Sequence, residues 1–208
     1  MEKIADMKAQ VKRVKDLSAV LKDLERYVKA PQFLYSGRAF RNFGLLPREV
    51  LGNWMICAVG NFEDSTALLT FGTDPMGGDG IVVNKKDGDV FFTEHVFIPR
   101  AASTATTTVE DLMCASVDHK AKKGAAYARG RHLVIFSEAT GLWYPSRAAR
   151  RIAGTHAFTS VWALHIDRGD DVEYVYSVTL LDAAREQAPV WKVVIGGDFK
   201  SWRVLRIQ

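Results

Sequence analysis

The sequence GGDGIVVNKKDGDVFFTEHVFI, residues 77–98, contains two apolar runs separated by a short polar turn. Runs of Val, Ile and Phe bounded by Gly and Asp predict β-strands, here residues 80–84 and 90–98. The intervening Lys-Lys-Asp-Gly at residues 85–88 predicts a hairpin turn. Because the turn is centred between residues 86 and 87, an antiparallel hairpin pairs residues whose numbers add up to about 173.

This register predicts that two carboxylates face each other. Asp79 and Glu94 satisfy the sum of 173, and directly opposite Cβ atoms lie about 4.5–5.5 Å apart. Two carboxylates at that spacing repel each other unless a cation or a proton bridges them. Mg²⁺ is commonly held by such a pair together with water and a substrate phosphate. A structural alternative stays open, because Asp is common in turns and a strand Glu is usually solvated.

A basic helix is predicted to follow the hairpin. Thr108 is a suitable N-cap with Asp111 three residues later, and the helical pattern continues through Ala128. The helix contains Lys120, Lys122 and Lys123, and the apolar run at residues 133–136 predicts a buried strand after it. Before the hairpin, residues 47–63 predict a central helix that begins at proline and carries Glu49 and Asn53 on one face.

In these features the chain resembles the PD-(D/E)XK nuclease superfamily, which has the restriction-endonuclease-like fold. The resemblance covers residues 47–140 and lies in Asp79, in Glu94 after 14 intervening residues, and in the helix and strand that follow. It implies a Mg²⁺- or Mn²⁺-dependent endonuclease that hydrolyses phosphodiester bonds. The metal ligands would be Asp79, Glu94 and the His95 carbonyl, with Glu49 as a further acid.

The sequence departs from the family at one position. The lysine that the family places two residues after the second acid is replaced here by Val96. A lysine of the following helix, Lys120 or Lys123, would take its catalytic role, as it does in some family members. The alternative is a catalytically inactive protein that keeps the fold and acts as a nucleic-acid-binding or protein-interaction module.

Basic residues are concentrated after the predicted site. Residues 119–151 contain eight Lys and Arg but only one acid, Glu138. A positive face of this kind predicts contacts with the phosphates of nucleic acid, with DNA more expected than RNA. The residues expected to make these contacts are Lys122, Arg129, Arg131, Arg147, Arg150 and Arg151.

Composition sets broader limits. The 208 residues carry 28 basic and 24 acidic side chains, and 48% of them are hydrophobic, which suits a folded domain. The sequence contains no uninterrupted apolar run of about 18 residues, which a membrane span would require. The charged N-terminus does not resemble a signal peptide. We therefore expect a cytoplasmic protein without membrane contact. Cys57 and Cys114 lie in apolar helical contexts, which predicts buried free thiols rather than a zinc site.

The N-terminus predicts an amphipathic helix over residues 1–29 that ends before Pro31. Its apolar stripe would pack on its own domain, form a homodimer or, as a third alternative, serve as an arm that binds nucleic acid. We therefore expect a helical segment at residues 1–30 and one α/β domain at residues 31–208. That domain would contain a mixed central β-sheet flanked by helices, with further strands near residues 158–166, 173–181 and 190–195.

Overall fold

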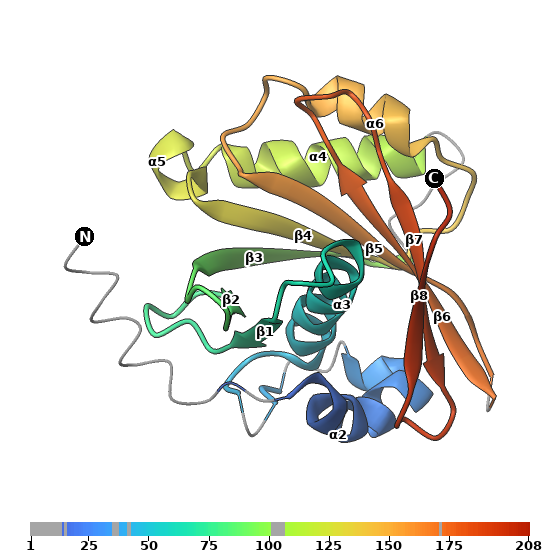
Figure 1. Ribbon diagram of the computed structural model, residues 1–208. Helices are drawn as coiled ribbons and strands as arrows, with labels where there is room; N and C mark the ends of the chain where they lie inside the picture. Colours follow the sequence, from blue (N-terminus) through green and yellow to red (C-terminus); the bar gives the residue numbers. More distant parts are fainter. Residues whose placement is uncertain (1–13, 15, 35–37, 41–42, 101–106, 171) are drawn as a thin grey trace. The chain divides into compact units, whose positions relative to one another are not determined.

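The computed structural model describes residues 14, 16–34, 38–40, 43–100, 107–170 and 172–208. These residues form a mixed α/β structure, as predicted (Figure 1). The helices are α2 (Leu17–Lys29), the 3-10 helix η1 (Pro31–Leu34), α3 (Pro47–Glu63), α4 (Val109–Ala121), α5 (Ala125–Ala128) and α6 (Pro145–Ile152). The strands are β1 (Leu69–Gly72), β2 (Ile81–Asn84), β3 (Val90–Ile98), β4 (Arg131–Ser137), β5 (Ser160–Gly169), β6 (Glu173–Leu181), β7 (Val190–Gly196) and β8 (Trp202–Arg206).

The strands follow one another in chain order, β1 to β8, in an eight-stranded sheet. The sheet is mixed, because β1, β2 and β3 pair antiparallel whereas β4 and β5 pair parallel. The chain divides into two compact units, and each is described by itself below. The first contains Met1–Thr93, Gly169–Tyr174 and Val194–Val204, and the second contains Glu94–Arg168, Val175–Val193 and Leu205–Gln208.

In the first unit, the described part of the N-terminal helix packs on its own domain. The side chain of Asp16 caps α2 by accepting the Ser18 N–H at 2.8 Å, and the apolar face of α2 is buried. Trp54 of α3 fixes the start of this helix by donating its indole N–H to the Leu17 carbonyl at 2.9 Å. One alternative for the apolar stripe is thereby confirmed for α2, whereas Ile4, Met7 and Val11 lie outside the described residues.

The central helix and the hairpin of the first unit are confirmed. Helix α3 begins at Pro47 and is buried over most of its length, as expected of a helix that is apolar on most faces. In the hairpin, Ile81 is the partner of Phe92, and the Thr93 N–H donates to the Gly80 carbonyl at 3.0 Å. Both pairs satisfy the predicted sum of 173, so the turn chemistry sets the register correctly up to Thr93.

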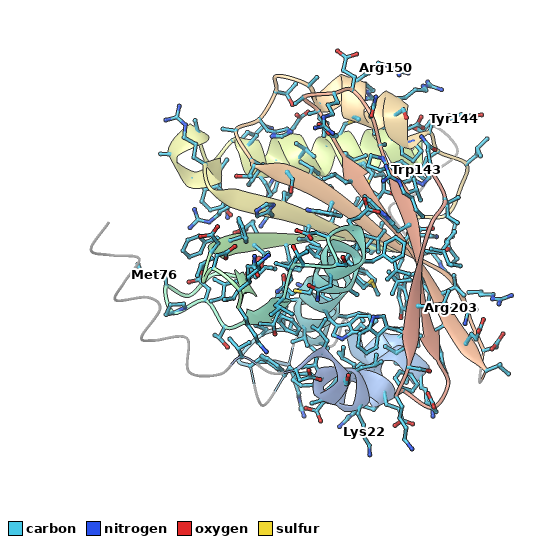
Figure 2. The ribbon with its side chains drawn as sticks, viewed as in Figure 1. Lys22, Met76, Trp143, Tyr144, Arg150 and Arg203 are labelled. Carbon is cyan, nitrogen blue, oxygen red and sulfur yellow. The ribbon has the colours of Figure 1, made fainter. Side chains whose placement is uncertain are left out.

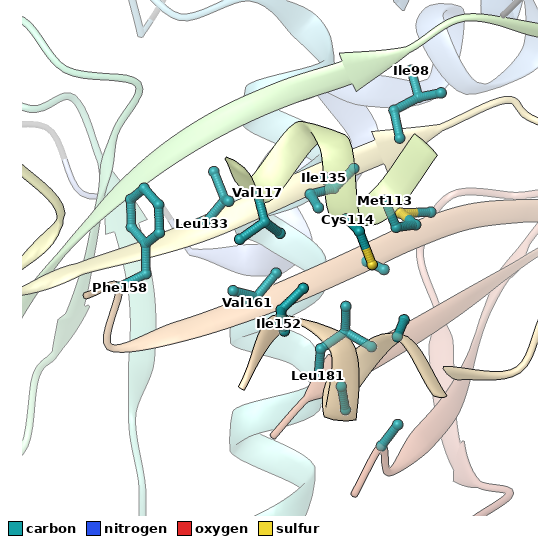
Figure 3. Close-up of a cluster of buried hydrophobic side chains, with 14 of the residues drawn as sticks. Ile98, Met113, Cys114, Val117, Leu133, Ile135, Ile152, Phe158, Val161 and Leu181 are labelled. Carbon is teal, nitrogen blue, oxygen red and sulfur yellow. The ribbon is translucent and has the colours of Figure 1, made fainter. Parts of the chain in front are cut away.

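In the second unit, α4 and α6 lie side by side and cover an apolar cluster that includes β4 and β5 side chains (Figures 1 and 3). Fully buried members include Val117, Leu133 and Val161. Burying each such side chain contributes about 1.5–3 kcal/mol relative to leaving it exposed. Cys114 belongs to this cluster and Cys57 is buried in α3, so both predicted buried thiols are confirmed.

One boundary predicted from the sequence is wrong. The helix that begins after Thr108 ends at Ala121 instead of continuing through Ala128, because Gly124 adopts a φ of +96° that a right-handed helix cannot accommodate. The short helix α5 then begins at Ala125. At the C-terminus, residues 202–206 form β8, a strand in addition to those predicted.

Among the described residues, no helix combines the length and the apolar character that a bilayer crossing requires.

Candidate functional site

Glu94 lies in the middle of β3, in the second unit. Its buried carboxylate is the centre of the candidate site. Only 8% of the residue is exposed, although a strand Glu is usually solvated. Val96, two residues further along the same strand, lies on the same face and packs against the apolar cluster. A buried carboxylate beside apolar packing needs compensating partners, and these come from the end of α4 and from α5.

Lys120 and Lys123 both approach Glu94. The Lys120 ammonium donates a hydrogen bond to Glu94 Oε1, and both side chains of this pair are largely buried, with 14% and 10% exposed. The Lys123 ammonium lies 3.6 Å from the same oxygen, but its side chain is 49% exposed. Lys120 is therefore the principal partner of the carboxylate, and Lys123 is a more mobile second cation at its edge.

Tyr127 of α5 completes the cluster, and the sequence did not identify it. Its hydroxyl group is hydrogen-bonded to Glu94 and also accepts a hydrogen bond from the Lys123 ammonium at 3.1 Å. The same ammonium lies 4.5 Å from the centre of the Tyr127 ring, and the Arg131 guanidinium lies 4.9 Å from it. Only the break at Gly124, which starts a new helix before Tyr127, could have indicated this role.

These contacts decide the ionisation of Glu94. Burial alone would raise its pKa, but the hydrogen bonds from Lys120 and Tyr127 and the charges of Lys120 and Lys123 outweigh it, so that the pKa lies below its usual value. Glu94 is consequently a carboxylate at neutral pH. The cluster then carries one negative charge against at least two positive charges, an arrangement that favours a further anion such as phosphate.

Asp79 follows a largely exposed turn of the first unit that is anchored by one buried carboxylate. The carboxylate of Asp74, which is 3% exposed, accepts the Met76 N–H at 2.7 Å and the Gly78 N–H at 3.1 Å. The buried Asn53 of α3 donates to the Asp79 carbonyl at 3.2 Å. Asn53 is therefore buried, and its side-chain amide is bonded to the backbone of the turn that carries Asp79.

Gly80 is required next to Asp79. Its φ is +133°, and an added Cβ would lie 2.4 Å from Asn53 Nδ2, so any side chain here would displace the amide that holds the Asp79 backbone. Asp79 belongs to the first unit and Glu94 to the second, and each is described within its own unit.

Glu49 and His95, the other predicted metal ligands, lie in different environments from that of Glu94. Glu49 lies in the first turn of α3, where its Oε2 accepts the Leu46 N–H at 2.8 Å and its Oε1 lies 3.7 Å from an Arg48 nitrogen. The carboxylate therefore caps the helix N-terminus, a position that stabilises negative charge. His95 follows Glu94 in β3 and is buried.

The predicted nucleic-acid contacts form two groups at opposite ends of α4. Lys122, Arg129 and Arg131 surround its C-terminal end near Lys120. At its N-terminal end, Arg147 lies 3.6 Å from Glu110, and Arg151 lies 2.9 Å from Asp111. The exposed Arg150 lies on α6 beyond the loop that carries Trp143 and Tyr144 (Figure 2).

The two groups of basic side chains lie far apart along α4 and have different acidic neighbours. Ten residues of helix between Glu110 and Lys120 span about 15 Å at 1.5 Å per residue. Two acids of α4 partly neutralise the α6 group, whereas Lys120 and Lys123 at the C-terminal end share the single carboxylate of Glu94. The basic side chains next to the candidate site are therefore those at the C-terminal end of α4.

Comparison with known proteins identifies no relative, since no family model, no curated protein and no solved structure matches the chain. Within the described ranges, no group of three or more His, Cys, Asp or Glu side chains is arranged to hold a metal ion.

Proposed function

We propose that the chain is a divalent-metal-dependent nuclease with a restriction-endonuclease-like core, in which Glu94 and Lys120 act on a phosphodiester. The observation that carries the proposal is the ion pair between these two side chains. In the resembling family, a lysine next to the second acid stabilises the phosphate. Here Val96 packs against apolar side chains, and α4 instead brings an ammonium group to the same carboxylate.

The order of elements supports this proposal. The helix α3, the antiparallel hairpin of β2 and β3, the helix α4 and the strand β4 follow in the order expected from the resemblance, with β1 and the short α5 as additional elements. Within the first unit, the hairpin also has the expected register, because Ile81 pairs with Phe92 and the Thr93 N–H donates to the Gly80 carbonyl.

The donor set fits Mg²⁺ or Mn²⁺. Magnesium is usually held by one or two carboxylates together with water and substrate phosphate, so a cluster of three protein acids is not required. Within the second unit, Glu94 would be a carboxylate ligand, with the His95 carbonyl as a second oxygen. The bound ion would supply an activated water and neutralise charge on the phosphate. Lys120 and Lys123 would hold the phosphate oxygens once a cation shares Glu94.

Cleavage assays test the proposal directly. Supercoiled plasmid, single-stranded DNA and RNA are incubated with Mg²⁺ or Mn²⁺, comparing wild type with Glu94→Gln, Asp79→Asn and Lys120→Met. Loss of one electrostatic contact to the transition state costs about 10²–10³-fold in rate, so each variant should lose at least that much. Asp87→Asn in the hairpin turn and Lys22→Met on α2 are the matched controls and should cleave normally. Full cleavage by Lys120→Met would refute the role given to the ion pair.

A second candidate is a nucleic-acid-binding module without cleavage. Val96 favours it, and so does the Glu94 carboxylate that is already neutralised by Lys120. This candidate predicts binding whose affinity falls steeply with salt and no product in any of the cleavage assays. Binding that is unaffected by removing Mg²⁺ and by Asp79→Asn would favour it over the nuclease.

A further inference from the structure

A cavity of about 380 Å³ lies in the second unit between the start of β5 and the end of β6. This volume falls within the range of about 300–1,000 Å³ that is typical of small-molecule sites. Its walls include Phe158 and Leu181, which also belong to the apolar cluster (Figure 3). Such walls suit a flat apolar ring rather than a fully hydrated ion.

The cavity adjoins the Glu94 cluster. The rings of Tyr127 and Phe158 meet edge to face with their centres 6.3 Å apart. On the neighbouring strand, the Thr159 N–H donates to the Arg131 carbonyl at 2.8 Å, and Thr159 lines the cavity. The guanidinium of Arg131 lies 4.9 Å from the centre of the Tyr127 ring, and that ring in turn contacts Phe158 of the cavity wall.

The polar side chains that line the cavity determine which charge a bound ligand can carry. Burial lowers the pKa of His156, whose Nδ1 accepts the Phe158 N–H at 3.1 Å, so this ring is neutral at pH 7. Asp182 supplies carboxylate oxygens and lies 3.7 Å from the exposed guanidinium of Arg185. The Asp182 carboxylate disfavours phosphate inside the cavity and favours a group with N–H donors. The neutral His156 ring adds no charge, and because its Nδ1 already accepts the Phe158 N–H, it can only donate through Nε2.

Ser160 adds a second polar contact. Its hydroxyl lies 2.6 Å from Nδ1 of His132, the residue that pairs with it across β4 and β5. Burial lowers the pKa of His132, which keeps this imidazole neutral as well. The Ser160 oxygen is thereby held in a fixed position on the cavity wall, where it can exchange one more hydrogen bond with a ligand.

We propose that this cavity binds an unpaired nucleobase that carries an exocyclic amino group, while its phosphate lies against Lys123 and Arg131. The inference rests on the proposed function and names its substrate class, because a paired base inside a duplex could not enter the cavity. The amino group donates to Asp182, and the base packs on Phe158. The nuclease would then act on single strands, or on a nucleotide turned out of a duplex, next to adenine, cytosine or guanine.

Calorimetry with nucleoside monophosphates tests this inference in EDTA, where cleavage cannot contribute. AMP, CMP and GMP should bind more tightly than UMP and TMP. One good base contact of this kind discriminates by roughly tenfold or more, and Asp182→Asn should abolish the preference. Ser160→Ala should weaken binding of all five, and Ser177→Ala, which lies outside the cavity on β6, is the matched control. Circular dichroism verifies that each variant is folded.

The outcomes separate this inference from the nuclease proposal. Inorganic phosphate that binds as well as AMP, equal affinity for AMP and UMP, or no nucleotide binding at millimolar concentration would each overturn the cavity assignment, even if the protein cleaves DNA. Conversely, selective nucleotide binding that depends on Asp182 would uphold it even if every cleavage assay is negative. In that event the nuclease proposal alone would fail.

Discussion

Replacing Lys120 by Met should destabilise the folded protein several times more than replacing Lys123 by Met. The two lysines lie three residues apart and approach the same Glu94 oxygen, so the comparison holds the carboxylate constant. Methionine keeps most of the length and the apolar stem of lysine, which limits the loss of packing. The difference between the variants therefore reports the electrostatic value of each contact.

The magnitude follows from burial. Lys120 and Glu94 side chains are 14% and 10% exposed, and removing one partner of a buried pair costs about 3–5 kcal/mol because the other charge is left uncompensated. Tyr127 remains in Lys120→Met, so we expect the lower end, about 3 kcal/mol. Lys123 is 49% exposed at 3.6 Å, and its loss should cost less than about 1 kcal/mol.

The pKa of Glu94 determines how the free energy of unfolding changes with pH. In the wild type the pKa of Glu94 is lowered, so its contribution to stability is present above the unfolded value of about 4.3 and is lost as pH falls through the lower folded pKa. In Lys120→Met, burial should dominate and raise that pKa. The penalty of the substitution is then largest at neutral pH. It begins to shrink as pH falls through the raised pKa of the variant, above about 4.3, and shrinks further down to the lowered pKa of the wild type.

Urea unfolding provides the measurement, followed by circular dichroism and by tryptophan fluorescence because the two units need not unfold together. The double variant Lys120→Met/Glu94→Gln should recover most of the lost free energy, since it removes both charges of the pair. If Lys120→Met and Lys123→Met agree within 0.5 kcal/mol, a typical limit of additivity, the reasoning from burial is refuted.

Three further predictions concern the framework around the site. Gly80→Ala should destabilise the first unit by about 2–4 kcal/mol through strain and a broken buried hydrogen bond. Gly77→Ala in the same turn also has positive φ but meets no atom within 4 Å, so it should cost less in the same urea titration. Hydrogen bonds from Thr108 lower the pKa of Asp111 to about 2, so an NMR titration of this carboxylate should find its midpoint well below that of an unfolded Asp. Burial raises the pKa of Cys57 far above its usual value, and its thiol should react with a thiol reagent only at the rate of unfolding; rapid labelling of the native protein would contradict its burial.

The parts of the fold that were predictable from the sequence are those set by local chemistry. The Lys-Lys-Asp-Gly turn and the alternating strands around it determine the hairpin register, and the pair Ile81 and Phe92 agrees with it. Thr108 caps α4 by the reciprocal hydrogen bonds that its spacing from Asp111 predicts. In each case, residues fewer than about a dozen positions apart decide the geometry.

The parts that failed depend on contacts between distant segments. Around Gly124, the flanking alanines and lysines favour a continuous helix, and the glycine is the one local signal that the helix can end there. The break is nevertheless what brings Tyr127 to Glu94. Likewise, Arg147 and Lys122 are close in sequence, but the path through β4 returns α6 to the opposite end of α4.

At Val96, the sequence and the structure give complementary information. From the sequence, a valine at this position is only the absence of an expected lysine. In the structure, Val96 packs against the apolar cluster under α4, where an ammonium group would lose its hydration without gaining a second acid. Lys120 reaches Glu94 from the end of that helix, with its stem along the apolar surface and its charge on the carboxylate. In the proposed nuclease, the catalytic cation would therefore come from a helix instead of the strand, while its carboxylate partner lies on β3.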